Sequence, residues 1–175
     1  MIDAHRDAGA DLTVGVVELG KSKAAALGVV EVDKKGNVVG FQEKPKDPKT
    51  IINKPDRIYG SMGIYVFNQD TLMQELKEDA NKDGSNHDFG KDIIPQMVKK
   101  GCKVTAFNFI DENKKEAQYW RDIGTIDAYY EANMDLVNKD PTFDLYDQAW
   151  PVRTYQEQFP PAKTVFAGKE ITRQV

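Results

Sequence analysis

Apolar residues in the first two thirds of this chain recur with the spacing of short, buried strands. The stretches rich in β-branched and aromatic residues predict strands over 12–19, 27–32, 38–43, 59–67 and 102–110. The second and third of these flank the sequence Asp33-Lys34-Lys35-Gly36-Asn37, whose turn-forming residues predict a β-hairpin.

Segments with helical spacing of apolar residues alternate with the strands. They cover 1–9, 69–77, 89–99 and 125–138. Gly9 ends the first, while Asp88 and Thr125 are the expected N-caps of the last two. Pro95 has no N–H to donate, which predicts a kink or a later start in the third helix.

This alternation predicts an α/β fold with a mixed sheet and flanking helices. A chain of 175 residues corresponds to one domain or to part of a larger one. From Pro141 onward the sequence is aromatic and proline-marked, and we expect an extended segment there.

Composition narrows the possible partners. The 24 basic and 28 acidic residues are well mixed and give a net charge of −4, so we expect neither nucleic acid nor a membrane surface as partner. The single cysteine, Cys102, excludes an internal disulfide and suits the cytoplasm. His5 and His87 are far apart, which argues against a zinc site.

The segment Tyr119-Trp120-Arg121-Asp122-Ile123-Gly124-Thr125 places a carboxylate just before a predicted helix. Helix N-termini at the edge of an α/β sheet favour phosphate binding, and Asp122 is best explained there if it holds a metal ion. The alternative is simply a strand end followed by a capped helix.

Charged and small residues mark two other strands. Glu43 and Lys44 end a strand before Pro45. A glutamate can bind sugar hydroxyls, and a lysine can bind phosphate. The simpler interpretation is an exposed ion pair. The small residues in 59–65 would let a ligand lie against the backbone and reach Ser61. The alternative is that they let a helix pack closely against the strand.

Asp88 as a helix cap is compatible with a ligand beside it, whereas His87 is expected to be an exposed loop residue without a catalytic role. The sequence contains neither a glycine-rich phosphate loop nor a nucleophile elbow.

Taken in order, these motifs closely resemble the bacterial glucose-1-phosphate adenylyltransferases (ADP-glucose pyrophosphorylases), and the match runs nearly end to end. The segments that carry the resemblance are Gly28, Glu43-Lys44-Pro45, 61–67, 87–95, 119–125, 150–155 and 160–163.

The resemblance implies a partial Rossmann-like nucleotidyltransferase domain. It implies that residues 1–150 correspond to the C-terminal half of the catalytic domain, and 151–175 to an extended lead-in to a missing left-handed β-helix. The implied reaction converts ATP and α-D-glucose 1-phosphate into ADP-glucose and pyrophosphate, in cytoplasmic glycogen biosynthesis.

The resemblance also implies roles for individual residues. Lys44 would hold the sugar phosphate, and Asp122 would be one of two aspartates that hold Mg²⁺; both would be catalytic. The other implied substrate-binding residues are Gly28, Glu43, Ser61, Tyr65, Asp88, Phe89 and Trp120. Lys44 and Asp122 are expected to converge on one cleft.

The family's glycine-rich nucleotide loop, its basic triphosphate contacts and its second metal aspartate would lie upstream of Met1. We therefore expect no turnover by this chain alone, and self-association of the partial sheet. Full-length members are expected to be allosteric homotetramers. Two alternatives remain: a hexose-1-phosphate uridylyl- or thymidylyltransferase, and a non-catalytic regulatory paralogue.

Overall fold

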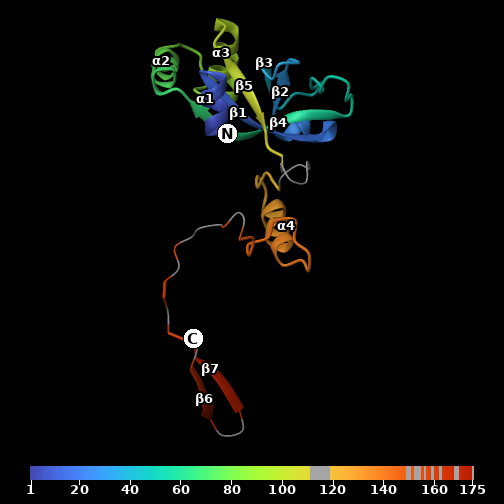
Figure 1. Ribbon diagram of the computed structural model, residues 1–175, viewed down its shortest axis with the longest axis vertical. Coiled ribbons are helices and arrows are strands. Elements are labelled where there is room, and N and C mark those ends of the chain that lie inside the picture. The colour runs from blue at the N-terminus through green and yellow to red at the C-terminus, as the bar shows by residue number, and fades with distance from the viewer. Residues whose placement is uncertain are drawn as a thin grey trace. The chain divides into compact units, whose positions relative to one another are not determined.

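A mixed five-stranded sheet organises the first part of the chain (Figure 1). The strands are β1 (Leu12–Gly20), β2 (Gly28–Val32), β3 (Val38–Glu43), β4 (Arg57–Phe67) and β5 (Val104–Asn108), in the spatial order β3-β2-β4-β1-β5. β1 runs parallel to β5, while the other neighbours pair antiparallel. The expected α/β fold with a mixed sheet is confirmed.

The fold is described from a computed structural model. It describes residues 1–110, 119–148, 163–167 and 170–174, together with positions 151, 155, 157, 158, 160 and 161. Most of the 150–155 segment lies outside the described residues.

Helical segments connect the strands. They are α1 (Ile2–Ala8), the 3₁₀-helix η1 (Lys21–Ala26), α2 (Gln69–Ala80), the π-helix η2 (Phe89–Ile93), α3 (Ile94–Lys100) and α4 (Ile126–Leu136). Gly9 caps α1 in the left-handed conformation, with φ of 55°. The side chain of Thr125 accepts from the N–H of Ala128 at 3.1 Å, as expected of a cap.

The segment predicted as one helix over 89–99 contains two helical types. η2 begins after Asp88, and α3 starts at Ile94 with Pro95 in its first turn. Proline is tolerated there because the first N–H groups of a helix have no partner within it. The expected later start is therefore confirmed.

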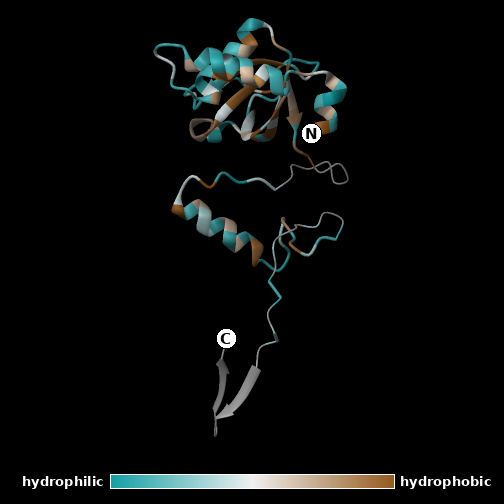
Figure 2. Cartoon of the chain, turned by 90° about the vertical axis from the view of Figure 1, so that its left-hand side faces the viewer, coloured by the Kyte–Doolittle hydropathy of each residue, from teal (hydrophilic) through white to brown (hydrophobic). Residues whose placement is uncertain are grey.

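Two apolar clusters form the core of the sheet unit. The larger joins β1, β2, β3 and β5 to η2 and α3 and includes the fully buried Leu12, Ile94 and Met97. The smaller contains Ala24, Leu27, Val29 and Ile58, with Trp120 packed against it. Figure 2 shows hydrophobic residues along the strands and mostly hydrophilic residues on the helices around them.

The chain divides into two compact units, Met1–Tyr129 and Tyr130–Val175. The second contains most of α4 and an antiparallel pair, β6 (Lys163–Ala167) and β7 (Glu170–Gln174). The aromatic, proline-marked sequence predicts an extended segment here but not this pairing. A local signal for the strands is present in the β-branched residues Thr164, Val165, Ile171 and Thr172.

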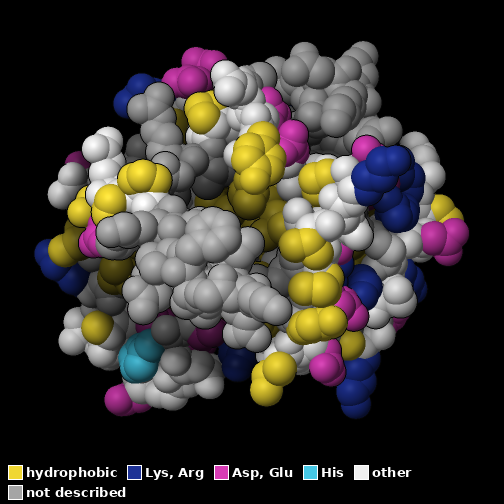
Figure 3. Space-filling view, turned by 90° about the horizontal axis from the view of Figure 1, so that it is seen from below, with side chains coloured by type: hydrophobic (Ala, Val, Ile, Leu, Met, Phe, Trp, Pro, Cys, Tyr) yellow, Lys and Arg dark blue, Asp and Glu magenta, His cyan; other side chains and the backbone are white. Residues whose placement is uncertain are grey.

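Charges of both signs are interspersed on the face seen from below in Figure 3. Within the described residues, no helix has the length and apolar character needed to cross a membrane.

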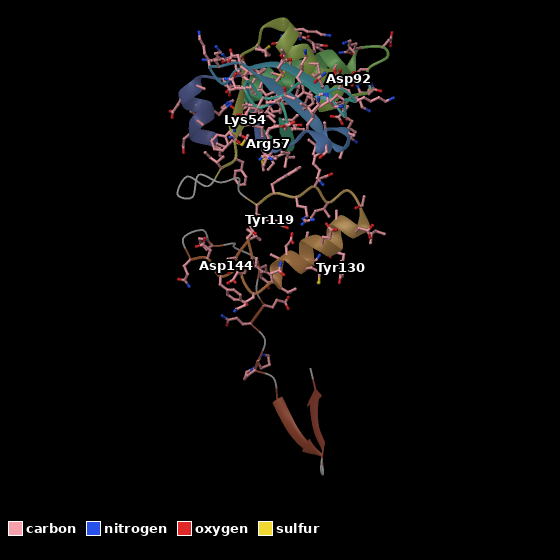
Figure 4. The ribbon with its side chains drawn as sticks, turned by 90° about the vertical axis from the view of Figure 1, so that its right-hand side faces the viewer. Lys54, Arg57, Asp92, Tyr119, Tyr130 and Asp144 are labelled. Atoms are coloured by element: carbon pink, nitrogen blue, oxygen red, sulfur yellow. The ribbon has the colours of Figure 1, made fainter. Side chains whose placement is uncertain are left out.

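An ion-pair cluster joins the end of β1 to the start of β4. Glu18 accepts from Lys54 Nζ at 2.7 Å and from Arg57 Nε at 2.9 Å (Figure 4). The hydrogen bond from Lys54 is the main cause that lowers the pKa of Glu18; the Arg57 hydrogen bond adds to it, and burial opposes it.

We predict that Met97→Ala lowers the free energy of unfolding by about 2–5 kcal/mol, because it leaves a cavity in the larger core cluster. Met73→Ala is the matched control, since Met73 is 47% exposed, and should change stability by less than about 0.5 kcal/mol. Urea denaturation measures both, and equal losses would contradict the described core.

We also predict that Lys54→Ala raises the titration midpoint of Glu18 toward its usual value of 4.5. A carboxylate with a depressed folded-state pKa stabilises the fold above its usual pKa, and this contribution is lost as the pH falls through the folded value. Lys54→Ala should therefore weaken the loss of stability below about pH 4.5. NMR titration of Glu18 measures the midpoint, and Lys49→Ala, at an exposed lysine of the same loop, should leave it unchanged.

Candidate functional site

A cavity of about 280 Å³ opens where β2, β3 and β4 meet η2. This volume lies near the lower end of the range for small-molecule sites. Its lining residues are Gly28, Phe41, Glu43, Ser61, Gly63, Tyr65, Asp88, Phe89 and Gly90.

Two glycines make room for the Glu43 side chain in this cavity. Gly28 pairs with Glu43 across β2 and β3, and a Cβ atom at Gly28 would lie 2.6 Å from the Phe41 ring. A Cβ atom at Gly90 would lie 2.8 Å from Glu43 Oε2. A side chain at Gly28 would collide with the Phe41 ring, and one at Gly90 would crowd the end of the Glu43 side chain. The two glycines therefore leave the space that Phe41 and Glu43 occupy.

Asp88 lines the cavity and caps η2. Its Oδ1 atom accepts from the N–H groups of Gly90 at 2.8 Å and Lys91 at 2.9 Å. These bonds satisfy two N–H groups that the first turn leaves unpaired, and they fix the carboxylate beside the cavity.

A bulge in β4 shapes the part of the cavity wall that contains Ser61, Gly63 and Tyr65. Between the pairs Val14–Tyr65 and Val16–Ser61 the register of β1 and β4 shifts, and Gly63 adopts a φ of 71° there. The N–H of Gly63 donates to Ser61 Oγ at 3.4 Å, and the hydroxyls of Ser61 and Tyr65 also lie 3.4 Å apart. The bulge thus brings Ser61 and Tyr65 into one cavity, and both offer hydroxyls.

Aromatic rings support this wall. Tyr65 stacks on Phe89, with ring centroids 5.8 Å apart, and Phe67 contacts both rings. Burial is the main cause that raises the pKa of Tyr65; the nearby Glu43 and Asp88 charges raise it further, and the Ser61 hydrogen bond opposes them. The Tyr65 hydroxyl therefore keeps its proton at neutral pH and can donate it in a hydrogen bond.

The chemistry of the lining suits a small, uncharged, hydroxyl-rich group. Glu43 and Asp88 accept hydrogen bonds, Ser61 and Tyr65 can donate or accept them, and Phe89 offers an apolar surface. None of the residues that line the cavity is a cation, so a phosphate would have to be held from outside the lining.

Lys44, the residue predicted to contact phosphate, directly follows the cavity residue Glu43. Its Nζ atom lies 3.9 Å from Glu43 Oε1, and its side chain is 60% exposed. The backbone of Lys44 has a φ of 47°, which is uncommon for a residue with a side chain and often marks a functional position.

Six of the predicted substrate-binding residues line the cavity: Gly28, Glu43, Ser61, Tyr65, Asp88 and Phe89. Lys44, Trp120 and Asp122 are not among the lining residues. Trp120 packs against the smaller core cluster, which includes Leu27 and Val29 on either side of Gly28 in the sequence. Asp122 is exposed, and its Oδ2 atom would lie 3.3 Å from a Cβ placed at Gly124.

Asp122 therefore stays a predicted metal ligand. In the described part of the chain, no group of three or more His, Cys, Asp or Glu residues could hold a metal ion. The convergence of Lys44 and Asp122 on one cleft also stays a prediction.

Three lining residues are not among the predicted site residues: Phe41, Gly63 and Gly90. Phe41 precedes Glu43 by two positions on the same strand, so the two residues face the same side of the sheet. Gly90 follows the predicted residues Asp88 and Phe89 directly in the sequence. Gly63 had been noted only as a small residue that permits close approach.

Comparison with curated proteins finds relatives that are named glucose-1-phosphate adenylyltransferase. The chain is 52% identical over 168 residues to a glucose-1-phosphate adenylyltransferase of Koribacter versatilis, covering 95% of this chain and 40% of the relative. It is 48% identical to the enzyme of that name from Rhodopirellula baltica, over 97% of this chain and 38% of the relative. For glucose-1-phosphate adenylyltransferase 1 of Vibrio cholerae the identity is 48%, over 94% of this chain and 41% of the relative.

The chain thus spans about two fifths of the length of these relatives. The sequence profile of the nucleotidyl transferase family matches residues 1–139, which include the whole sheet and every residue of the cavity. This chain belongs to the nucleotidyl transferase family.

Proposed function

We propose that this chain provides the sugar-phosphate half of the active site of a glucose-1-phosphate adenylyltransferase. The observation that carries this proposal is the cavity, in which two carboxylates and two hydroxyls surround a space for a small polyhydroxyl group. The similarity to relatives with this name over nearly the whole chain supports the same substrate and favours ATP over UTP or dTTP.

The proposed reaction transfers AMP from ATP to α-D-glucose 1-phosphate and gives ADP-glucose and pyrophosphate, as a step of glycogen biosynthesis. The sugar phosphate oxygen attacks the α-phosphorus of ATP in line. No covalent enzyme intermediate is required, so the protein acts by positioning and by neutralising charge.

Within the cavity, Glu43 and Asp88 would accept hydrogen bonds from glucose hydroxyls. Ser61 and Tyr65 would bind further hydroxyls, and Phe89 would lie against the apolar face of the ring. Gly28 would contact the sugar from the cavity wall, and Trp120 would border the site from the neighbouring core cluster.

Lys44 would hold the sugar phosphate. Its ammonium group lies beside a cavity carboxylate and is largely exposed, so it can reach an anion at the cavity mouth. An ammonium group on a flexible stem serves as a point charge for phosphate.

Asp122 would be a ligand of Mg²⁺. Protein sites for Mg²⁺ commonly supply one or two carboxylates, and substrate phosphates and waters complete the coordination. The exposed carboxylate of Asp122 fits that pattern. When bound, Mg²⁺ would neutralise charge on the reacting phosphates.

The nucleotide half of the site would come from residues outside this sequence, because the chain contains no glycine-rich phosphate loop. We also propose a cytoplasmic location, a homotetramer for the full-length protein, and a role for 151–175 as the lead-in to a further domain. Exposed apolar residues on α4, including Ile126 at 86%, are compatible with self-association of this chain.

We predict that Lys44→Ala weakens the binding of glucose 1-phosphate roughly 10- to 100-fold, because it removes a charged contact to phosphate. Binding of glucose, which has no phosphate, should remain within about twofold. Isothermal titration calorimetry measures both ligands.

The matched control is Lys46→Ala, which removes an exposed lysine two positions along the chain. It should leave the affinity for glucose 1-phosphate unchanged. Equal losses in the two variants, or a loss for glucose as large as that for glucose 1-phosphate, would exclude Lys44 as the specific phosphate contact.

We further predict that the chain on its own forms no ADP-glucose from ATP, glucose 1-phosphate and Mg²⁺. The reason is the lack of a nucleotide-binding loop in its sequence. A coupled assay for released pyrophosphate measures this, and measurable synthesis would refute the division of the site proposed here.

A further inference from the structure

A second polar cluster lies on the loop that precedes Asp88. It consists of Asp79 in the last turn of α2 and of Ser85 and His87 in the loop, and we call it the Asp79 cluster. The Asp79 carboxylate accepts from Ser85 Oγ at 2.7 Å and lies 2.8 Å from His87 Nδ1. Asp79 is only 4% exposed, whereas the His87 side chain is 59% exposed.

We propose that Ser85 and His87 are positioning residues, which tie the loop to Asp79 and so hold Asp88 in the sugar cavity. This inference rests on the function proposed above, because it assigns a role toward the same cavity. The sequence predicts only an exposed loop histidine without a catalytic role, and the His87 side chain is 59% exposed.

Burial gives the first argument. A carboxylate removed from water is unfavourable unless donors compensate it. Asp79 receives its two donors from side chains of the loop, and these hydrogen bonds lower its pKa, with that from Ser85 the largest cause. Release of the loop would therefore remove both of these donors from the Asp79 carboxylate.

The backbone geometry of His87 gives the second argument for the positioning role. His87 has a φ of 54°, in the left-handed region that residues with a side chain rarely adopt. Its N–H donates to Ser85 Oγ at 3.0 Å, and its ring reaches Asp79. Interactions that hold an unfavourable conformation are expected where the exact course of the chain matters.

The connection of the loop to the cavity gives the third argument for the positioning role. His87 directly precedes Asp88, which caps η2 through the N–H groups of Gly90 and Lys91. From the other side, Asp92 accepts from the N–H groups of Asn86 and Asp88. The loop is thus held by Asp79 of α2 and Asp92 of η2 immediately before its cavity residue; Asp92 is labelled in Figure 4.

The three residue types also occur in hydrolase triads, but their arrangement here differs. In a triad the serine hydroxyl donates to the histidine ring, which activates it as a nucleophile. Ser85 instead donates to Asp79. This geometry supports a structural link to the cavity and not a nucleophile.

The test compares His87→Ala with His87→Asn in the same chain. Asparagine keeps an N–H donor close to the position of Nδ1 and tolerates the left-handed conformation. Amide hydrogen exchange at Gly90 and Lys91 reports whether Asp88 still caps η2, and calorimetry reports the affinity for glucose 1-phosphate.

We expect His87→Ala to speed exchange at both amides and to weaken glucose 1-phosphate binding by about tenfold. His87→Asn should restore both to within about threefold of the unmodified chain. Asp83→Asn, which changes an exposed carboxylate of the same loop, is the control and should alter neither.

Ser85→Ala provides a second variant if His87→Ala does not fold, and it should change both readouts in the same direction. Unchanged exchange at Gly90 and Lys91 in the folded variants would overturn the positioning role. The unmodified chain could also fail to bind glucose 1-phosphate while exchange is faster in the variants. That outcome would support the link between the loop and the cap but reject the proposed substrate. Equal effects of His87→Asn and His87→Ala would also overturn the role of the His87 hydrogen bond.

Discussion

The site depends on the space that two glycines leave around the Glu43 carboxylate. A Cβ atom at Gly28 of β2 would lie 2.6 Å from the Phe41 ring and 3.2 Å from Glu43 Oε2. One at Gly90 of η2 would lie 2.8 Å from the same oxygen. Glu43 ends the edge strand β3, so it could otherwise turn to solvent. Because Gly28 and Gly90 have no side chains, the Glu43 carboxylate has room to line the cavity.

The other walls follow from local backbone features around this carboxylate. The β4 bulge brings the hydroxyls of Ser61 and Tyr65 to within 3.4 Å of each other, and the cap of η2 fixes Asp88. The larger core cluster holds these elements together, since Ile93 at the end of η2 and Ile94 and Met97 of α3 pack in it with residues of the sheet. A site made by convergence of four separate segments thus rests on one apolar core.

Much of this arrangement could be predicted from the sequence. The strands, the hairpin turn, the caps of α1 and α4 and the late start of α3 all depend on local patterns of apolar, glycine and proline residues. Six cavity residues were also predicted, but mainly through the family resemblance, because taken alone Glu43 or Ser61 had simpler structural interpretations.

The remaining features depend on contacts between distant segments. The strand order and the bulge opposite Gly15 arise from pairing of β1 with β4, which no local pattern specifies. Gly90 and Phe41 become cavity residues only when β3 meets η2. The role of His87 depends on Asp79, eight positions away, and a loop histidine gives no local sign of such a partner.

The central claim is that the cavity around Glu43 binds the sugar of a sugar phosphate. NMR titration of the backbone amides with glucose 1-phosphate, compared with inorganic phosphate, tests it most directly. The account predicts that the amide signals of Gly28, Gly63 and Gly90 shift with glucose 1-phosphate and do not shift with phosphate alone. Shifts confined to other parts of the chain, or identical shifts with both ligands, would contradict it.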